Sequence, residues 1–159
     1  MPAPVATDLV WNEIEKRVFA VLSYVNPKGQ ARSAGIVYVV RDRVLYIGTG
    51  DDSWKAKHIA LNPNVALCVN IPKRIPFLPW IKIPDATILF SGAARVLTVD
   101  ETSPDIIDAL LKGMVDDPAL RETTRVVEVR PAGDFVTYGV GVPLLEMRDP
   151  EKAGGRAPV

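Results

Sequence analysis

The amino-acid sequence predicts a mainly β (α+β) domain, a barrel or sandwich of antiparallel strands with a few short helices. Short apolar runs typical of strands recur along the chain and are separated by turn signals rich in Gly, Pro and Asn. Several runs are apolar on both faces, so both faces must be covered. One face can line a barrel, and the other then meets a helix or a second subunit. The length of 159 residues, 48% of them hydrophobic, suffices for one domain with its own core.

The expected elements can be placed by residue number. Strands are expected at residues 18–25, 36–40, 44–48, 65–71, 87–99, 126–129 and 135–140. Gly92 predicts a bend or bulge in the fifth strand. A first short helix, begun by Thr7 or Asp8, reaches Lys16. Residues 149–159, rich in Gly, Pro and charge, are expected to be a disordered tail after a domain at residues 1–148.

A second helical pattern lies at residues 102–115. Ser103 is the expected cap and Pro104 takes the first turn. One apolar stripe would face the core, formed by Ile106, Ile107, Leu110, Leu111 and Met114.

Composition and charge exclude several function classes. The 19 basic and 19 acidic residues balance, so the chain lacks the global basic field of a nucleic-acid-binding protein. No apolar run reaches the ~18 residues of a membrane span, and the first residues do not resemble a signal peptide. The single cysteine, Cys68, is expected to be a buried, inert thiol. No cluster of metal-ligating residues is visible. Together these features favour a cytoplasmic protein.

The segment 44–69 carries the clearest chemical signal. A strand ending at Gly48 runs into the polar turn 49–52, and Ser53 then caps a short helix that carries Lys55 and Lys57. Hydroxyls, free backbone N–H groups and ammonium groups at a helix N-terminus are typical of a phosphate site. Two features favour a plain solvated helix face instead. The aspartates of the turn repel a phosphate unless they point outward, and the two lysines lie ~200° apart on a regular helix.

The order of these motifs resembles the pyridoxamine 5'-phosphate oxidase-like, FMN-binding split-barrel superfamily of flavin- and deazaflavin-dependent oxidoreductases. The matching residues are Thr49, then Ser53-Trp54-Lys55, then Asn62-Pro63-Asn64-Val65-Ala66. Residues 19–40 resemble the family's first hairpin, with its turn at 27–29, and residues 87–96 resemble a later strand. The resemblance covers roughly residues 8–140 and implies a six- to seven-stranded antiparallel split β-barrel.

The resemblance also implies a homodimer with the cofactor at the subunit interface. Thr49, Ser53, Lys55 and Lys57 would hold the FMN phosphate, while the backbone of the second strand would contact the flavin ring. Thr87 stands where the family has a Gln that contacts the flavin. The implied cofactor-binding residues are Gly35, Ile36, Val37, Tyr38, Gly48, Thr49, Ser53, Lys55, Lys57 and Thr87. For the second-strand residues, plain core packing is the alternative interpretation.

The chain departs from the authentic oxidase at several positions. Ala34 and Trp54 stand where that enzyme has arginines, and its C-terminal arginine and histidine pattern is missing. The expected function is therefore that of an FMN-dependent oxidoreductase acting on a small molecule other than pyridoxamine phosphate. One alternative is a reductase using a reduced deazaflavin coenzyme. Another is a non-enzymatic flavin- or tetrapyrrole-binding protein, since no acid–base residue stands out. His58, the only histidine, is expected at the surface or in a supporting role.

A proline-rich segment at residues 72–84 stands apart from the rest. Its four prolines exclude a helix or a central strand, and its large apolar side chains are costly to leave in water. It can be an ordered loop packed on the barrel or on a partner subunit. It can also be a lid whose Phe77 and Trp80 border a substrate pocket, or a basic and aromatic contact with a membrane surface.

Overall fold

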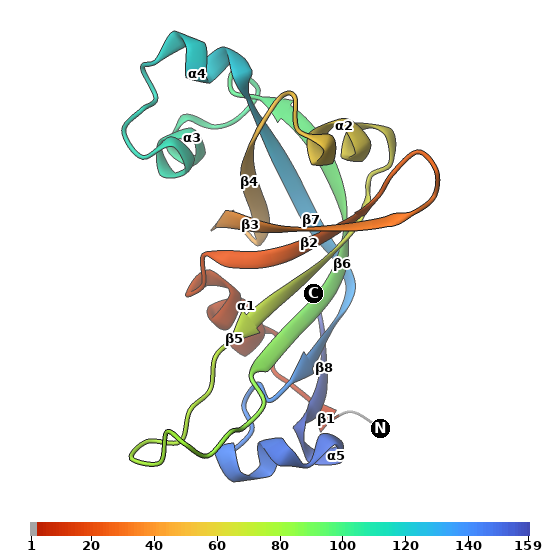
Figure 1. Cartoon of the computed structure of the whole chain (residues 1–159), viewed down its shortest axis with the longest axis vertical. Helices are drawn as coiled ribbons and strands as arrows, with labels where there is room; N and C mark the ends of the chain where they lie inside the picture. The colour runs from red at the N-terminus through yellow and green to blue at the C-terminus, as the bar shows by residue number, and fades with distance from the viewer. Residues whose placement is uncertain (1–2) are drawn as a thin grey trace.

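The computed structural model describes residues 3–159 and shows a mostly β architecture (Figure 1). The strands are β1 (Ala3–Pro4), β2 (Phe19–Val25), β3 (Ala31–Arg41), β4 (Val44–Gly50), β5 (Asn64–Ile71), β6 (Ala86–Thr98), β7 (Thr124–Tyr138) and β8 (Gly154–Pro158). The helices are α1 (Thr7–Glu15), α2 (Trp54–Leu61), α3 (Pro104–Leu111), α4 (Pro118–Thr123), the 3-10 helix η1 (Leu144–Arg148) and α5 (Pro150–Ala153).

Six antiparallel strands close into a barrel. The sheet order is β1-β8-β7-β4-β3-β2-β5-β6, and an additional pairing of β6 with β7 joins the ends of the six-stranded part. The expected antiparallel barrel with a few short helices is confirmed. Strands β1 and β8 lie outside this barrel, on the free edge of the lower part of β7 (Figure 1).

The barrel interior is filled by every second side chain of its strands. Ile36 and Tyr38 of β3 and Leu45 and Ile47 of β4 are buried there. This alternation follows from the two-residue period of a strand. Helix α1 adds three apolar side chains to the same core, Val10, Trp11 and Ile14.

A second, smaller core lies outside the barrel beneath α3. It joins Ile107 and Leu111 of α3 to Leu97 and Val126 of the neighbouring strands. The expected helix is shorter than predicted, because Lys112 and Gly113 both adopt a positive φ and end it. Met114 consequently lies beyond α3 and is 60% exposed. Ser103 occupies the N-cap position but makes no capping hydrogen bond there.

The expected bulge at Gly92 is wrong in position. The register of β6 and β7 shifts between Leu89 and Ser91, where extra residues of β7 include Gly133 with a φ of +79°. Gly92 instead allows the backbones of β6 and β7 to approach closely, since a Cβ there would stand 2.6 Å from the carbonyl oxygen of Arg130. The two last strands predicted from the sequence, at residues 126–129 and 135–140, consequently belong to the single strand β7, which contains this irregularity.

The segment 149–159, expected to be disordered, forms α5 and β8 in the structure. Strand β8 pairs antiparallel with β7 and parallel with β1, and the side chain of Ala157 is buried in the barrel core. The glycine content has a packing purpose, because a Cβ on Gly155 would stand 2.5 Å from both Thr137 Oγ1 and Val5 Cγ2. Composition alone therefore misled the prediction here.

Candidate functional site

An opening in the barrel wall separates β3 from β4. The two strands pair only where Tyr38–Arg41 faces Val44–Ile47. Beyond that stretch β4 continues beside β7 as far as Gly50, while the first part of β3 pairs with β2. The facing edges of residues 31–37 and 48–50 therefore lack a ladder partner among the described strands. Unpaired backbone N–H and C=O groups are left along both edges.

The sequence-predicted phosphate residues meet at one end of this opening. Thr49 Oγ1 donates a hydrogen bond to Ser53 Oγ at 3.0 Å, and Ser53 Oγ accepts one from the backbone N–H of Ala56 at 3.2 Å. Ser53 is the N-cap of α2, as predicted. Lys55, half-buried, lies in the first turn of this helix. Two hydroxyls, a lysine and a helix N-terminus therefore share one corner.

Arg125 changes the electrostatics of this corner. It pairs with Thr49 across β4 and β7, and its Nη2 lies 4.0 Å from Asp51 Oδ2. Asp51 is thus held toward a cation, which reduces its repulsion of an anion. No local sequence pattern indicates Arg125, because its position at this corner depends on the pairing of β4 with β7.

Lys57 does not join the corner. Its Nζ lies 5.2 Å from the ring centre of Trp54, and that ring contacts His58 in a tilted arrangement with ring centres 5.5 Å apart. The two lysines thus diverge, as their spacing on a regular helix requires. His58 is half-buried, and its Nδ1 is enclosed without a hydrogen-bond partner in the described chain.

The residues of β3 divide between the two faces of the strand. Ile36 and Tyr38 point into the barrel, so core packing accounts for their side chains, and only their backbone could face a ligand. Tyr38 Oη donates to the carbonyl oxygen of Ile14 at 2.6 Å, and burial raises the pKa of the Tyr38 phenol well above its usual value. Gly35 and Val37 point outward. A Cβ on Gly35 would stand 3.0 Å from the ring of Phe19, an outward aromatic residue that the sequence analysis did not single out.

Gly48 and Thr87 lie apart from one another. Gly48 follows the paired part of β4, and a Cβ there would stand 3.9 Å from Leu110 of α3. Thr49 of β4 and Thr98 at the end of β6 both pair with Arg125 of β7, so the two threonines lie at the same end of the barrel. Thr87 is the second residue of β6, roughly 35 Å away along the strand.

Phe77 and Trp80 lie at the same far end as Thr87, in the loop that joins β5 to β6 (Figure 1). Both side chains are exposed. Within one chain, the predicted residues therefore form two groups. Thr49, Ser53 and Lys55 are close together, whereas Thr87, Phe77 and Trp80 belong to the opposite end.

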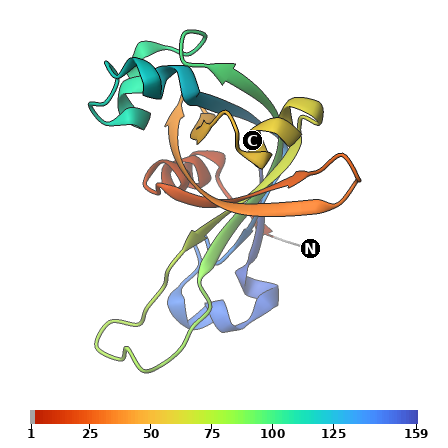
Figure 2. The same ribbon diagram turned by 45° about the horizontal axis from the view of Figure 1, so that its top comes forward.

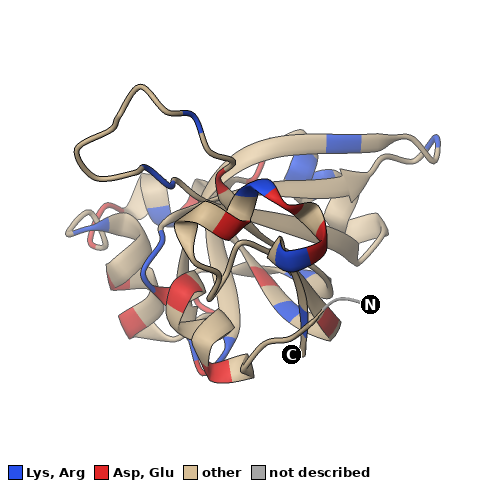
Figure 3. Ribbon diagram, turned by 90° about the horizontal axis from the view of Figure 1, so that it is seen from below, with Lys and Arg blue, Asp and Glu red and all other residues tan. Residues whose placement is uncertain are grey.

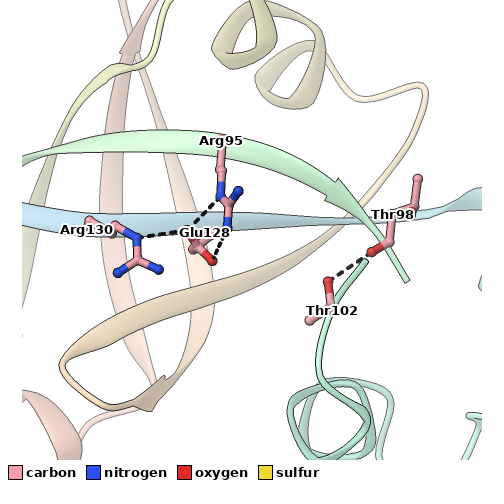
Figure 4. Close-up of polar contacts among 5 residues, drawn as sticks. All are labelled: Arg95, Thr98, Thr102, Glu128 and Arg130. Carbon is pink, nitrogen blue, oxygen red and sulfur yellow. Dashed lines mark hydrogen bonds and ion pairs between the residues drawn. The ribbon is translucent and has the colours of Figure 1, made fainter. Parts of the chain in front are cut away.

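A buried carboxylate between two arginines lies elsewhere on the barrel. Glu128 accepts hydrogen bonds from Arg95 Nε at 2.8 Å, from Arg95 Nη2 at 3.2 Å and from Arg130 Nε at 3.1 Å (Figure 4). The hydrogen bond from Arg95 is the main reason that the pKa of Glu128 lies below its usual value. This cluster ties β6 to β7, and we assign it a structural role.

Other classes of site find little support in the part of the chain that the structure describes. Residues 3–159 contain no group of three His, Cys, Asp or Glu side chains placed to hold a metal ion. Burial raises the pKa of the Cys68 thiol, which makes a reactive thiolate less accessible. No described helix has both the length and the apolar character needed to cross a membrane.

Comparison with known proteins shows the fold but no close relative. No family model and no curated protein sequence matches the chain. Among solved structures, a candidate pyridoxamine 5'-phosphate oxidase from Listeria innocua is 16% identical, with a TM-score of 0.58, over 78% of this chain and 91% of that one. An F420 reductase is 20% identical, with a TM-score of 0.53, over 78% of this chain and 94% of that one.

A third similar structure is a heme binding protein from Mycobacterium smegmatis. It is 13% identical, with a TM-score of 0.61, over 87% of this chain and 56% of that one. At these identities the likeness concerns the fold and not the chemistry. The barrel, its opening between β3 and β4 and these neighbours together show that the chain has the split-barrel fold of the pyridoxamine 5'-phosphate oxidase-like proteins.

Proposed function

We propose that the protein binds FMN and is an oxidoreductase acting on a small molecule other than pyridoxamine phosphate. The observation that carries this proposal is the corner formed by Thr49, Ser53 and Lys55 at the N-terminus of α2, beside the opening between β3 and β4. Hydroxyl and backbone donors together with an ammonium group suit a phosphate dianion.

The chain's own residues would bind and orient the cofactor. Thr49, Ser53 and Lys55 would hold the phosphate, with Lys57 contributing only after leaving the ring of Trp54. The free backbone edge of residues 31–37 could pair with the polar edge of a flavin ring, and Gly35 would let the ring approach closely. The flavin would supply the electron-transfer chemistry, for which the chain needs no redox-active side chain.

A homodimer is part of the same proposal. Outward-facing residues line up across five strands through the pairs Gly35–Val21, Val21–Cys68, Cys68–Leu89 and Leu89–Val136. We call these five residues the outer row. Phe19 and Val37, also exposed, pair beside it. A continuous apolar stripe on a sheet face favours burial against another surface, and a second copy presents a matching one.

Two copies would also complete the site. Thr87, Phe77 and Trp80 are too far from Ser53 in one chain to contact the same small ligand. A cofactor contact for Thr87 therefore requires the far end of a second copy beside the phosphate corner of the first. A substrate-pocket role for Phe77 and Trp80 would require the same arrangement and would exclude any other partner for these two side chains.

The test is a titration of the protein with FMN and with riboflavin, which lacks the phosphate. Lys55→Ala should weaken FMN binding by about 1.5–3 kcal/mol, the scale of a hydrogen bond to a charged group, and leave riboflavin binding nearly unchanged. Lys57→Ala is the matched control and should have the smaller effect, since Lys57 lies over Trp54. Equal losses of the two ligands in the Lys55 variant would refute the phosphate assignment.

The other cofactor classes are distinguished by the absorption spectrum of the purified protein. Oxidised flavin gives a yellow protein, and a tetrapyrrole gives a Soret band. A protein that binds only a reduced deazaflavin would be purified colourless. The fold neighbours described as an F420 reductase and a heme binding protein motivate these two alternatives. We place the protein in the cytoplasm under each of them.

A further inference from the structure

The loop between β5 and β6 presents an apolar tip to solvent. We define the tip as residues 76–80, all of which are exposed, with Phe77 96% and Trp80 72% accessible. Figure 2 shows the loop projecting away from the barrel. Two large aromatic side chains at the end of a projecting loop favour a partner that accepts apolar groups.

The backbone of the tip holds this exposed arrangement. Phe77 has a φ of +67°, a region that bulky side chains rarely adopt. Such local strain is typical of residues placed for a function. Two successive turns close the tip, with Leu78 N donating to Ile75 O at 3.3 Å and Ile81 N donating to Leu78 O at 3.1 Å.

Positive charge surrounds the base of the tip. Lys73, Arg74 and Lys82 flank it, and residues 72–84 contain no acidic residue although the whole chain has a formal charge of zero. The next acidic residue along the chain, Asp85, lies at the root, where it accepts hydrogen bonds from Lys73 N and Asn70 Nδ2. Figure 3 shows basic and no acidic segments along the projecting part of the loop.

We propose that this tip docks onto an anionic phospholipid membrane. Phe77 and Trp80 would enter the interfacial region, and the three cations would contact lipid phosphates. Anionic headgroups complement the three cations, and the lipid interface accepts the two aromatic rings. Prolines 72, 76, 79 and 84 prevent the loop from adding a strand to a sheet edge of a second copy. In this role Phe77 and Trp80 contact lipid and not the substrate pocket of a second copy.

The test is co-sedimentation of the full-length protein with vesicles. Binding is expected to phosphatidylcholine vesicles that contain about 30 mol% phosphatidylglycerol, and not to pure phosphatidylcholine. The double variant Phe77→Ser/Trp80→Ser and the triple variant Lys73→Gln/Arg74→Gln/Lys82→Gln should each bind the anionic vesicles about tenfold or more weakly. High salt should weaken wild-type binding because it screens the cations.

Met114→Ser is the control, since Met114 is an apolar side chain that is also exposed, at 60%, but follows α3 at the other end of the molecule; it should bind like the wild type. All variants should keep the wild-type melting temperature, because the replaced side chains make few contacts. Failure of the wild type to bind anionic vesicles, or unchanged binding by the tip variant, would overturn the proposal. A tip variant that binds anionic vesicles like the wild type, but no longer forms a dimer in sedimentation, would also overturn the proposal. That result would identify the tip as a contact between copies.

Discussion

At the scale of single residues, hydrogen bonds stabilise a carboxylate that is buried in the protein. Glu128 is the clearest case, because its side chain is 5% exposed yet receives hydrogen bonds from two arginines whose own side chains face solvent. A carboxylate buried in this way is stabilised only while it remains ionised. The cluster therefore links the stability of the β6–β7 pair to pH.

The pH dependence has a definite sign. The folded pKa of Glu128 is lowered, so its stabilisation is complete above the unfolded value of about 4.3 and is lost as the pH falls through the folded pKa. Glu128→Gln should cost about 1 kcal/mol at neutral pH, a modest figure because both arginines are exposed. Urea unfolding of both proteins should show the difference shrinking below about pH 4. A difference that stays constant from pH 7 to pH 3 would contradict this account.

The phosphate corner illustrates which residues a sequence can reveal. Thr49, Ser53 and Lys55 lie within a few positions of each other, so local spacing was enough to group them. Arg125 joins them only through the pairing of β4 with β7, which are distant in the sequence, and no local pattern predicts this pairing. Lys57 belongs to the same local pattern, but its Nζ lies over the ring of Trp54, three residues earlier on the same helix, and therefore outside the corner.

At the scale of elements, the alternation of apolar residues predicted most strands, and turn signals predicted their ends. The misses share a physical cause. The segment 149–159 gains its order from hydrogen bonds to β7 and β1, which composition cannot report. The two last predicted strands merge because a bulge lets β7 bend without ending. Helix α4 depends on its Asp117 cap and on packing of Leu120, and has only six residues to signal its presence.

Gly92 offers a test of how closely β6 and β7 pack. Gly92→Ala should lower the free energy of unfolding by about 1–3 kcal/mol, because the new Cβ would collide with the backbone of Arg130. Gly48→Ala is the matched control in another strand; its Cβ would find ordinary contact distances, and the change should stay within about 0.5 kcal/mol. Denaturant melts of the two variants decide the matter, and equal effects would show that the strands can separate at Gly92 without cost.

At the scale of the whole molecule, the apolar outer row predicts self-association. Leu89→Lys places a charge in the middle of that row and should convert a dimer into a monomer in sedimentation velocity. Leu145→Lys, at an exposed apolar position outside the row, should leave the dimer intact. Because the cofactor site is proposed to need two copies, FMN affinity should fall in the Leu89 variant and should depend on protein concentration in the wild type. A wild-type protein that is monomeric at micromolar concentration would refute both the dimer and the cofactor site that needs two copies.

The pairing of β1 with β8 has a consequence for the order in which the chain can assemble. Ala3 and Pro4 find their strand partners only at Gly155 and Arg156, and Thr7 Oγ1 donates to the carbonyl oxygen of Pro158. During synthesis residues 3–7 must wait until residues 155–158 have left the ribosome. Contacts between such distant positions form slowly, since a very long loop must close first. The newly made barrel is therefore expected to pass through a stage in which β1 and β8 are still unpaired with each other and open to proteases.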